Sequence, residues 1–223
     1  MAKRGRRDRK YVRRQPSRGR YDRSSIDAVL DSGLVAHVAF VDSGQPYCIP
    51  MMYGRVDDSV FIHGSRSSRV MRTLATGVPA CITVTVLDGL VLARSAFEHS
   101  ANYRSVVLVG SFLVPEDQTR KLEAFEAFTN KLVPDRWDEV RKPTVQELKS
   151  SSILEMPIDE AAMKTRSGPP SDDDSPDAAL STWAGVVPIE SRPGDPDPSP
   201  GLTEGIPLAE SVRSLIRGGT LHR

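Results

Sequence analysis

A histidine followed by small hydroxyl residues and arginines is the stretch of this chain best suited to chemistry. Residues 61–69 read FIHGSRSSR, and residues 70–74 continue with helical character. A strand that enters a Ser/Gly-rich turn before a helix can hold a phosphate, because free N–H groups, hydroxyls and the helix dipole face the anion. Arginine adds a charge-assisted fork. Since the turn lacks the Gly-Lys-Ser/Thr ending of a P-loop, we expect a phosphate from something other than ATP.

The histidines differ in what their positions allow. His63 ends an apolar run, where a histidine can transfer protons near neutral pH or can simply complete the strand. His37 lies inside an apolar strand, which favours a structural role, and His99 lies in a polar loop, which favours solvation. His63 is therefore the candidate catalytic residue.

Charge is unevenly distributed along the chain. Of its 223 residues, 30 are Lys or Arg and 29 are Asp or Glu, which gives a net charge of +1. Residues 1–23 carry eleven basic and two acidic side chains, a net +9, so the remaining chain carries −8. Such an arm has three interpretations: a disordered solubility tail, a nonspecific binder of nucleic acid or anionic lipid, or, over Arg18–Asp22, a segment that docks on the folded domain.

Cysteine usage and hydropathy narrow the class of protein. Cys48 and Cys81 lack metal-ligand spacing, so we expect buried structural thiols and no metal site. The acidic run 172–174 lacks the spacing of a calcium loop and is expected to be a solvated linker. No apolar run approaches the roughly 20 residues that span a bilayer, and no signal peptide is visible. The expected location is cytoplasmic, without membrane contact.

Short strands dominate the pattern after the first 33 residues. Strands are predicted at 34–41, 46–56, 59–63, 79–93, 103–114 and 152–166, the first three as an antiparallel meander. The Asp88-Gly89 pair lies between β-branched runs and predicts a hairpin. This pattern indicates a mainly β protein with a few helices, built as a small antiparallel barrel.

Helices are fewer and are marked by caps and apolar spacing. They are predicted from Ser24 or Ser25 to Gly33, at 66–76, at 115–134 and after the Thr144–Glu147 capping box. The composition then divides the chain into a disordered basic arm (1–20), the barrel domain (21–166), a loop with a closing strand (167–190) and a Pro/Gly-rich tail with a short helix (191–223).

An ordered set of motifs resembles the pyridoxamine 5′-phosphate oxidase-related, FMN-binding split-barrel superfamily, in particular its nitroimidazole-reductase-like flavin-binding branch. The motifs are RGRYD at 18–22, QPYCIPMMY at 45–53, HGSRSSR at 63–69, LARSAF at 92–97 with NYRSVV at 102–107, and WAGVVP at 183–188. The resemblance covers roughly residues 13–190. It implies a homodimer of split barrels with FMN at the dimer interface.

The resemblance also implies roles for individual residues. Phosphate contacts fall on the turn and ring contacts on two strands: Gly64, Ser65, Ser68 and Arg69 for the phosphate, Pro50, Met51 and Met52 along the isoalloxazine, Thr83 and Val84 flanking it, Tyr103 and Ser105 for ribityl or phosphate, and His63 near the pocket. Some members of the branch carry Gly and Lys where this chain has Ser68 and Arg69. The tail lacks the basic segment of true pyridoxamine-phosphate oxidases. The resemblance therefore does not imply that this chain acts on their substrate.

These observations predict a flavin-dependent oxidoreductase that acts on an unidentified small-molecule substrate or acceptor, with the hydride chemistry residing in the cofactor. A flavin-binding or storage protein without turnover is the first alternative. A second alternative is a protein of the same fold that uses deazaflavin or haem. A haem would need an axial ligand, for which His63 and His99 are the candidates. A nucleic-acid partner acting through the basic arm is the last.

Overall fold

The computed structural model describes residues 11–219, which form two compact units. Unit 1 comprises the chain up to Gly33 together with Ile82–Val109 and Asp159–Glu190. Unit 2 comprises Leu34–Cys81, Gly110–Ile158 and the chain from Ser191 onward. Because the units interleave along the sequence, the four consecutive parts expected from composition stay a prediction.

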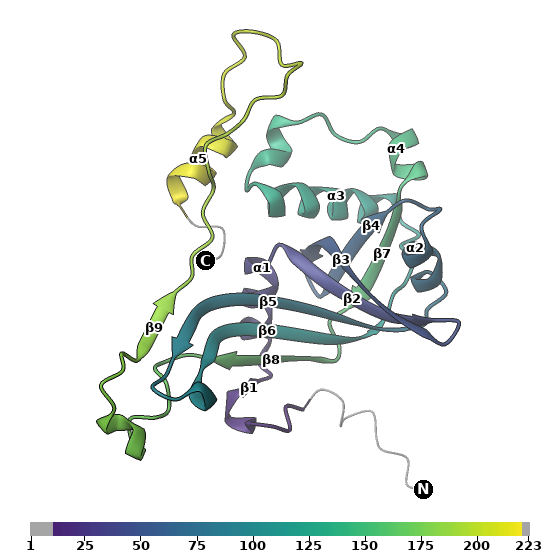
Figure 1. The fold of residues 1–223 in the computed structure, drawn as a ribbon. Helices are drawn as coiled ribbons and strands as arrows, with labels where there is room; N and C mark the ends of the chain where they lie inside the picture. Colours follow the sequence, from purple (N-terminus) through teal and green to yellow (C-terminus); the bar gives the residue numbers. More distant parts are fainter. Residues whose placement is uncertain (1–10, 220–223) are drawn as a thin grey trace, which may run out of the picture. The chain divides into compact units, whose positions relative to one another are not determined.

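Unit 1 is built on antiparallel strands that lie side by side in Figure 1. Their order is β1 (Gly19–Arg20), β8 (Ala161–Arg166), β6 (Ser100–Ser111) and β5 (Pro79–Leu92), and β9 (Gly185–Pro188) pairs with the end of β5. Along β5 the side chains alternate, so that Ile82, Val84 and Val86 are buried while Thr85 and Leu87 are exposed. This period of two is what a half-buried strand requires.

The opening helix of unit 1, α1 (Arg23–Ser32), has its N-cap two residues before Ser24, the earlier of the two predicted serine caps. Its N-cap is Asp22, whose carboxylate accepts a hydrogen bond from the backbone N–H of Ser25 at 3.0 Å. Hydrogen bonds with the Ser25 side chain and then with its backbone N–H lower the pKa of Asp22. The helix buries Ile26, Val29 and Leu30, as its apolar spacing predicts.

The predicted hairpin at Asp88-Gly89 is wrong, because β5 runs straight through it. A type I′ turn needs positive φ at both central residues, and Gly89 has none. The Asp88 carboxylate instead accepts both arms of the Arg104 guanidinium, at 2.9–3.2 Å, and Gly89 pairs with Pro188 of β9. A distant charge partner and a distant strand thus override a local turn signal.

The basic arm is ordered in its described part. Residues 16–18 form the 3-10 helix η2 (Pro16–Arg18), and β1 pairs with β8 through Gly19↔Lys164 and Arg20↔Met163. The expectation of disorder over 1–20 is therefore wrong for this part, because strand pairing fixes the backbone, and the docking interpretation holds for Gly19–Arg20. Residues 1–10 lie outside the described residues.

Unit 2 is the predicted meander closed by one more strand. β2 (Val35–Asp42), β3 (Gln45–Val56), β4 (Ser59–Gly64) and β7 (Ser152–Pro157) pair antiparallel in this order. Ser43 and Gly44 both have positive φ, which suits the two-residue turn between β2 and β3. The predicted single strand at 152–166 is in fact two, β7 and β8, separated by residues 158–160.

The helix α3 (Gln118–Leu132) packs against β3 of unit 2 (Figure 1). Gly54 permits this approach, because a Cβ added there would lie 3.0 Å from Ala127 Cβ. Beneath the helix, Phe61, Ala124, Phe128 and Ile153 form a buried apolar cluster. α4 (Val145–Ser150) begins at the predicted Thr144–Glu147 capping box, in which both reciprocal bonds are formed.

The remaining elements of the described chain are short. They are α2 (Arg69–Leu74), α5 (Glu210–Gly218) and the 3-10 helices η3 (Ala96–Glu98), η4 (Arg136–Glu139) and η5 (Pro176–Ala179). None of the helices found within residues 11–219 has the length and apolar composition needed to cross a bilayer.

Candidate functional site

The predicted phosphate turn of unit 2 satisfies its own hydroxyl groups. The hydroxyl of Ser68 donates to the carbonyl of Ser65 at 2.8 Å and accepts from the N–H of Met71 as the N-cap of α2. The hydroxyls of Ser65 and Ser67 are bonded to each other at 2.8 Å. Since α2 is only six residues long, its dipole adds little, and the turn offers an anion fewer free donors than its sequence indicates.

Arg69 lies over a neighbouring aromatic ring. Its guanidinium carbon is 4.8 Å from the centroid of the Tyr47 ring, a cation–π arrangement. No ion pair of Arg69 occurs within residues 11–219. The edge of the guanidinium therefore remains available for an anion while its face is held by Tyr47.

His63 lies at the end of β4 beside the aromatic side chains of α3. Its ring is 4.6 Å from that of Phe128 and 6.3 Å from that of Phe125. Burial lowers the pKa of His63 below its usual 6.5, so the imidazole is neutral at neutral pH. A neutral imidazole can accept a proton or bind a metal, and His63 keeps this capacity. Next to it, Gly64 leaves room for Met71, whose Cγ would lie 3.0 Å from an added Cβ.

The strands β2 and β3 present an apolar strip that the sequence did not reveal. In their register His37 lies opposite Pro50, and Val35 lies opposite Met52. His37, Pro50 and Val35 are exposed and Met52 is half-buried, whereas Met51 points to the other face. The expected structural role of His37 is thus wrong: the buried neighbours Ala36 and Val38 take the core, and alternation turns the histidine outward.

The free thiols follow the same alternation. Cys48 is exposed on β3 and Cys81 is half-buried, so the expectation of two buried thiols is wrong. No cluster of three or more metal-binding side chains forms within residues 11–219. The strip around His37 is accordingly an open surface of apolar, sulfur and imidazole groups.

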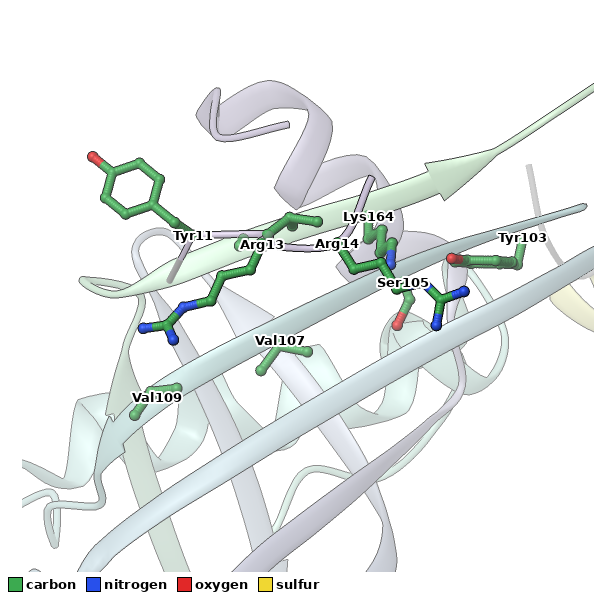
Figure 2. Close-up of a pocket in the computed structure, with 10 residues that line it drawn as sticks. Tyr11, Arg13, Arg14, Tyr103, Ser105, Val107, Val109 and Lys164 are labelled. Atoms are coloured by element: carbon green, nitrogen blue, oxygen red, sulfur yellow. The ribbon is translucent and has the colours of Figure 1, made fainter. Parts of the chain in front are cut away.

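Unit 1 contains a cavity of about 440 Å³ on the outer face of β6 and β8. Figure 2 shows Tyr103, Ser105, Lys164 and Arg14 near one another at one end, Tyr11 and Arg13 toward the other end, and Val107 and Val109 of β6 below them. Ser105 and Lys164 are direct partners in the β6–β8 register, which places both side chains on one face. The volume falls within the roughly 300–1,000 Å³ range of cofactor sites.

The electrostatics of this cavity favour an anionic ligand. Tyr11, Val12, Arg13, Val107, Val109 and Ala162 complete its lining, so that no carboxylate borders it. Lys164 and Arg14 form no ion pair within residues 11–219. The hydroxyl of Ser105 is 2.8 Å from that of Thr85 on β5, so a small polar network borders the cations. Together these groups can bind a phosphate and the hydroxyls of an attached sugar alcohol.

The predicted site residues are therefore distributed over both units. Unit 1 brings together Tyr103 and Ser105, with Thr83 half-buried on the same face of β5 as Thr85. The side chain of Val84 is fully buried in the core, so only its backbone can face a ligand. Lys164 was missed, although alternation along 161–166 opposite 103–108 would have placed it beside Ser105.

The fold that these elements form is a split β-barrel, mainly antiparallel β with five α-helices in the described residues. The sequence model of the pyridoxamine 5′-phosphate oxidase family matches residues 22–165. The chain belongs to this family. The predicted family and fold class are thereby confirmed.

Solved structures extend the match over almost the whole chain. The FAD and heme binding protein from Mycobacterium smegmatis is 39% identical, with a TM-score of 0.86 over 92% of this chain and 100% of that one. The flavocytochrome Anf3 from Azotobacter vinelandii is 36% identical, with a TM-score of 0.85 over 93% and 96%.

A third structure shares the fold alone. A candidate 5-nitroimidazole antibiotic resistance protein from Bacteroides thetaiotaomicron is 19% identical, with a TM-score of 0.56 over 66% of this chain and 85% of that one. No curated protein matches the chain.

Proposed function

We propose that this protein is a redox protein that binds a flavin together with haem. The observation that carries the proposal is the full-length similarity, at 39% and 36% identity, to a protein named for FAD and heme binding and to a flavocytochrome. The resemblance found in the sequence implied FMN. These two relatives favour FAD, which has the same isoalloxazine ring and one phosphate more.

The residues of unit 1 fit the anionic part of a flavin. Lys164 and Arg14 would neutralise phosphate, and Tyr103 and Ser105 would donate hydrogen bonds to it or to the ribityl hydroxyls. Unit 2 by itself offers a separate candidate surface, in which the strip of Pro50 and Met52 is apolar enough to contact a ring and Arg69 supplies a cation. A bound flavin supplies hydride or single-electron transfer, and haem supplies single-electron transfer.

Among the described residues, three histidines are available to ligate a haem iron. The Nδ1 atom of His99 is 2.8 Å from the carbonyl oxygen of Ser95, an arrangement that orients the ring and leaves Nε2 for a metal. The pKa of His63 is lowered by partial desolvation, which favours the neutral imidazole that binds iron. His37 lies exposed on the apolar strip of β2 and β3. We rank His99 first, because its carbonyl partner is the usual support of a metal-binding histidine.

The visible absorbance spectrum of the purified full chain tests this function. We expect flavin bands and a Soret band, both of which change on reduction, and FAD as the flavin released by acid. Replacing His37, His63 or His99 singly by Gln should remove the Soret band in at least one variant and leave the flavin in place. Absence of both chromophores after supplementation with FAD and hemin would refute the proposal.

Turnover and assembly complete the proposal. The protein acts as an oxidoreductase toward a small-molecule acceptor, which anaerobic reduction of the bound flavin by NADH or NADPH and reoxidation by candidate acceptors would show. It is a homodimer, supported by the apolar side chains that each unit leaves exposed on its strands: Val35 and Val41 in unit 2, and Leu87 and Val107 in unit 1. Light scattering on the purified protein measures the mass of the assembly.

A further inference from the structure

A second cavity in unit 1 is lined almost entirely by cations and hydroxyls. It measures about 230 Å³ and lies where β8 ends and the following loop begins. Three arginines and four hydroxyl side chains border it, and no carboxylate does: Arg18, Arg20, Arg166, Ser17, Thr165, Ser167 and Ser171, with Pro169. It shares no lining residue with the cavity around Lys164.

Arg166 is a buried guanidinium whose partners are all neutral. Only 7% of the residue is exposed, and it donates to the side-chain oxygen of Asn102 and to the carbonyls of Gly168 and Pro169 at 3.2 and 3.0 Å. No carboxylate pairs with it within residues 11–219. Burial, and then the charge of Arg18, lower the pKa of Arg166. Its positive charge is thus held at a cost that an anion would offset.

Two other arginines of the same unit do have carboxylate partners. Arg94 pairs with Asp172 and Asp173, and Arg104 pairs with Asp88 through a bidentate contact. Arg18, by contrast, donates no hydrogen bond from its guanidinium to any of the described residues, and it lies close enough to Arg166 to affect its pKa. Arg18 and Arg166, neither of which pairs with a carboxylate among the described residues, meet at one cavity, where their like charges repel each other.

We propose that this cavity binds a phosphate group, as inorganic phosphate or diphosphate or as the phosphate end of a nucleotide. Arginine forks match phosphate oxygens bidentately, and the hydroxyls of Ser17 and Ser171 add neutral donors, whereas that of Thr165 donates to the carbonyl of Tyr103. The volume is below the roughly 300–1,000 Å³ of sites that enclose a cofactor, so a nucleotide would insert only its phosphates. The proposal stands independently of the flavin assignment.

Isothermal titration of the purified full chain with sodium pyrophosphate, in a low-salt buffer free of phosphate, tests the site. We expect saturable binding with one pyrophosphate per chain. The Arg18→Gln variant should bind roughly tenfold more weakly or worse, because it loses one charge-assisted contact. This variant breaks no hydrogen bond among the described residues, so its fold should persist, which a thermal melt verifies.

Arg213→Gln is the matched control. It removes the same charge from unit 2, where Arg213 is exposed and paired with Glu210, and it should leave the affinity for pyrophosphate within about twofold. Absence of saturable binding, or equal weakening in the two variants, would overturn the proposal.

Titration of the flavin-free and of the flavin-loaded protein distinguishes the sources of the phosphate. Binding of pyrophosphate to the flavin-free form alone would identify the phosphates of the flavin as the occupant. Binding to both forms would identify a separate phosphate ligand, and binding to neither overturns the site. The flavin content of each sample is read from its spectrum, so a chain without flavin would refute the proposed function and still report on this cavity.

Discussion

The hydroxyls of the Ser65–Ser68 turn in unit 2 bond to one another, whereas Lys164 and Arg18 in unit 1 face cavities without a carboxylate. Both regions carry the residue types of a phosphate site. They differ in whether the donors are already engaged, and an anion gains most from donors that folding has left open. Free donors, more than a serine- and arginine-rich sequence, therefore indicate where a phosphate binds.

The two units also differ in the interactions that stabilise each of them. Unit 2 relies on an apolar cluster beneath α3, around Phe61 and Phe128. In unit 1 Arg94 pairs with Asp172, whose side chain is fully buried, whereas the side chains of the Arg120–Glu155 pair in unit 2 are 25% and 18% exposed. The expectation of a solvated linker is wrong for Asp172, since its carboxylate accepts from the backbone and the side chain of Arg94, at 2.6 and 3.2 Å.

The largest expected effect is the loss of the cluster beneath α3. Phe128→Ala should lower the free energy of unfolding by about 3–5 kcal/mol, because it removes a buried ring and leaves a cavity beside His63. Chemical denaturation followed by circular dichroism measures it. The exposed Leu132→Ala, on the same helix, is the control and should change stability far less. Equal losses in the two variants would contradict the assignment of Phe128 to the buried cluster and of Leu132 to the surface.

Breaking the buried pair of unit 1 should come next. Asp172→Ala should cost about 3 kcal/mol, because it leaves the Arg94 backbone N–H without its acceptor and removes a carboxylate paired with the half-buried guanidinium. Asp174→Ala removes an exposed carboxylate two residues away and should be within about 0.5 kcal/mol of the parent. Denaturation at low and high salt checks this, since a buried pair is screened little. A loss confined to low salt would point to a surface effect.

Flavin affinity compares the two candidate phosphate contacts directly. Lys164→Gln should weaken flavin binding roughly tenfold, because a cation without an ion pair among the described residues is removed from an open cavity. Arg69→Gln should have the smaller effect, since Arg69 is already engaged with Tyr47. Fluorescence titration of the flavin-free chain measures both. A larger loss for Arg69 would return the phosphate to the Ser65–Ser68 turn.

The smallest expected effect is a dependence of stability on pH. Because burial lowers the pKa of His63 in the folded chain, the unfolded chain binds more protons between that pKa and about 6.5. The free energy of unfolding should therefore fall as the pH drops through 6.5 toward the folded pKa. His63→Gln should flatten this part of the profile. An unchanged slope in the variant would show that another group titrates there.

Local patterns in the sequence determined much of this protein. Apolar, β-rich runs bounded by turn residues predicted β2, β3 and β4, the apolar spacing predicted α3, and the Thr144–Glu147 box is formed as expected. The ordered motifs were enough to indicate the family whose sequence model matches residues 22–165. These features succeed because strand period, helix spacing and caps depend on neighbours within a few residues.

Only the tertiary structure decided which polar groups are satisfied. Asp88 binds Arg104 rather than starting a turn, Asp172 is buried by Arg94, and Arg166 is buried without a carboxylate among the described residues. These partners lie up to 78 residues apart along the chain. A residue's type fixes the charge it carries, but burial and the partner brought by distant strands decide whether that charge holds the fold together or remains free to bind a ligand.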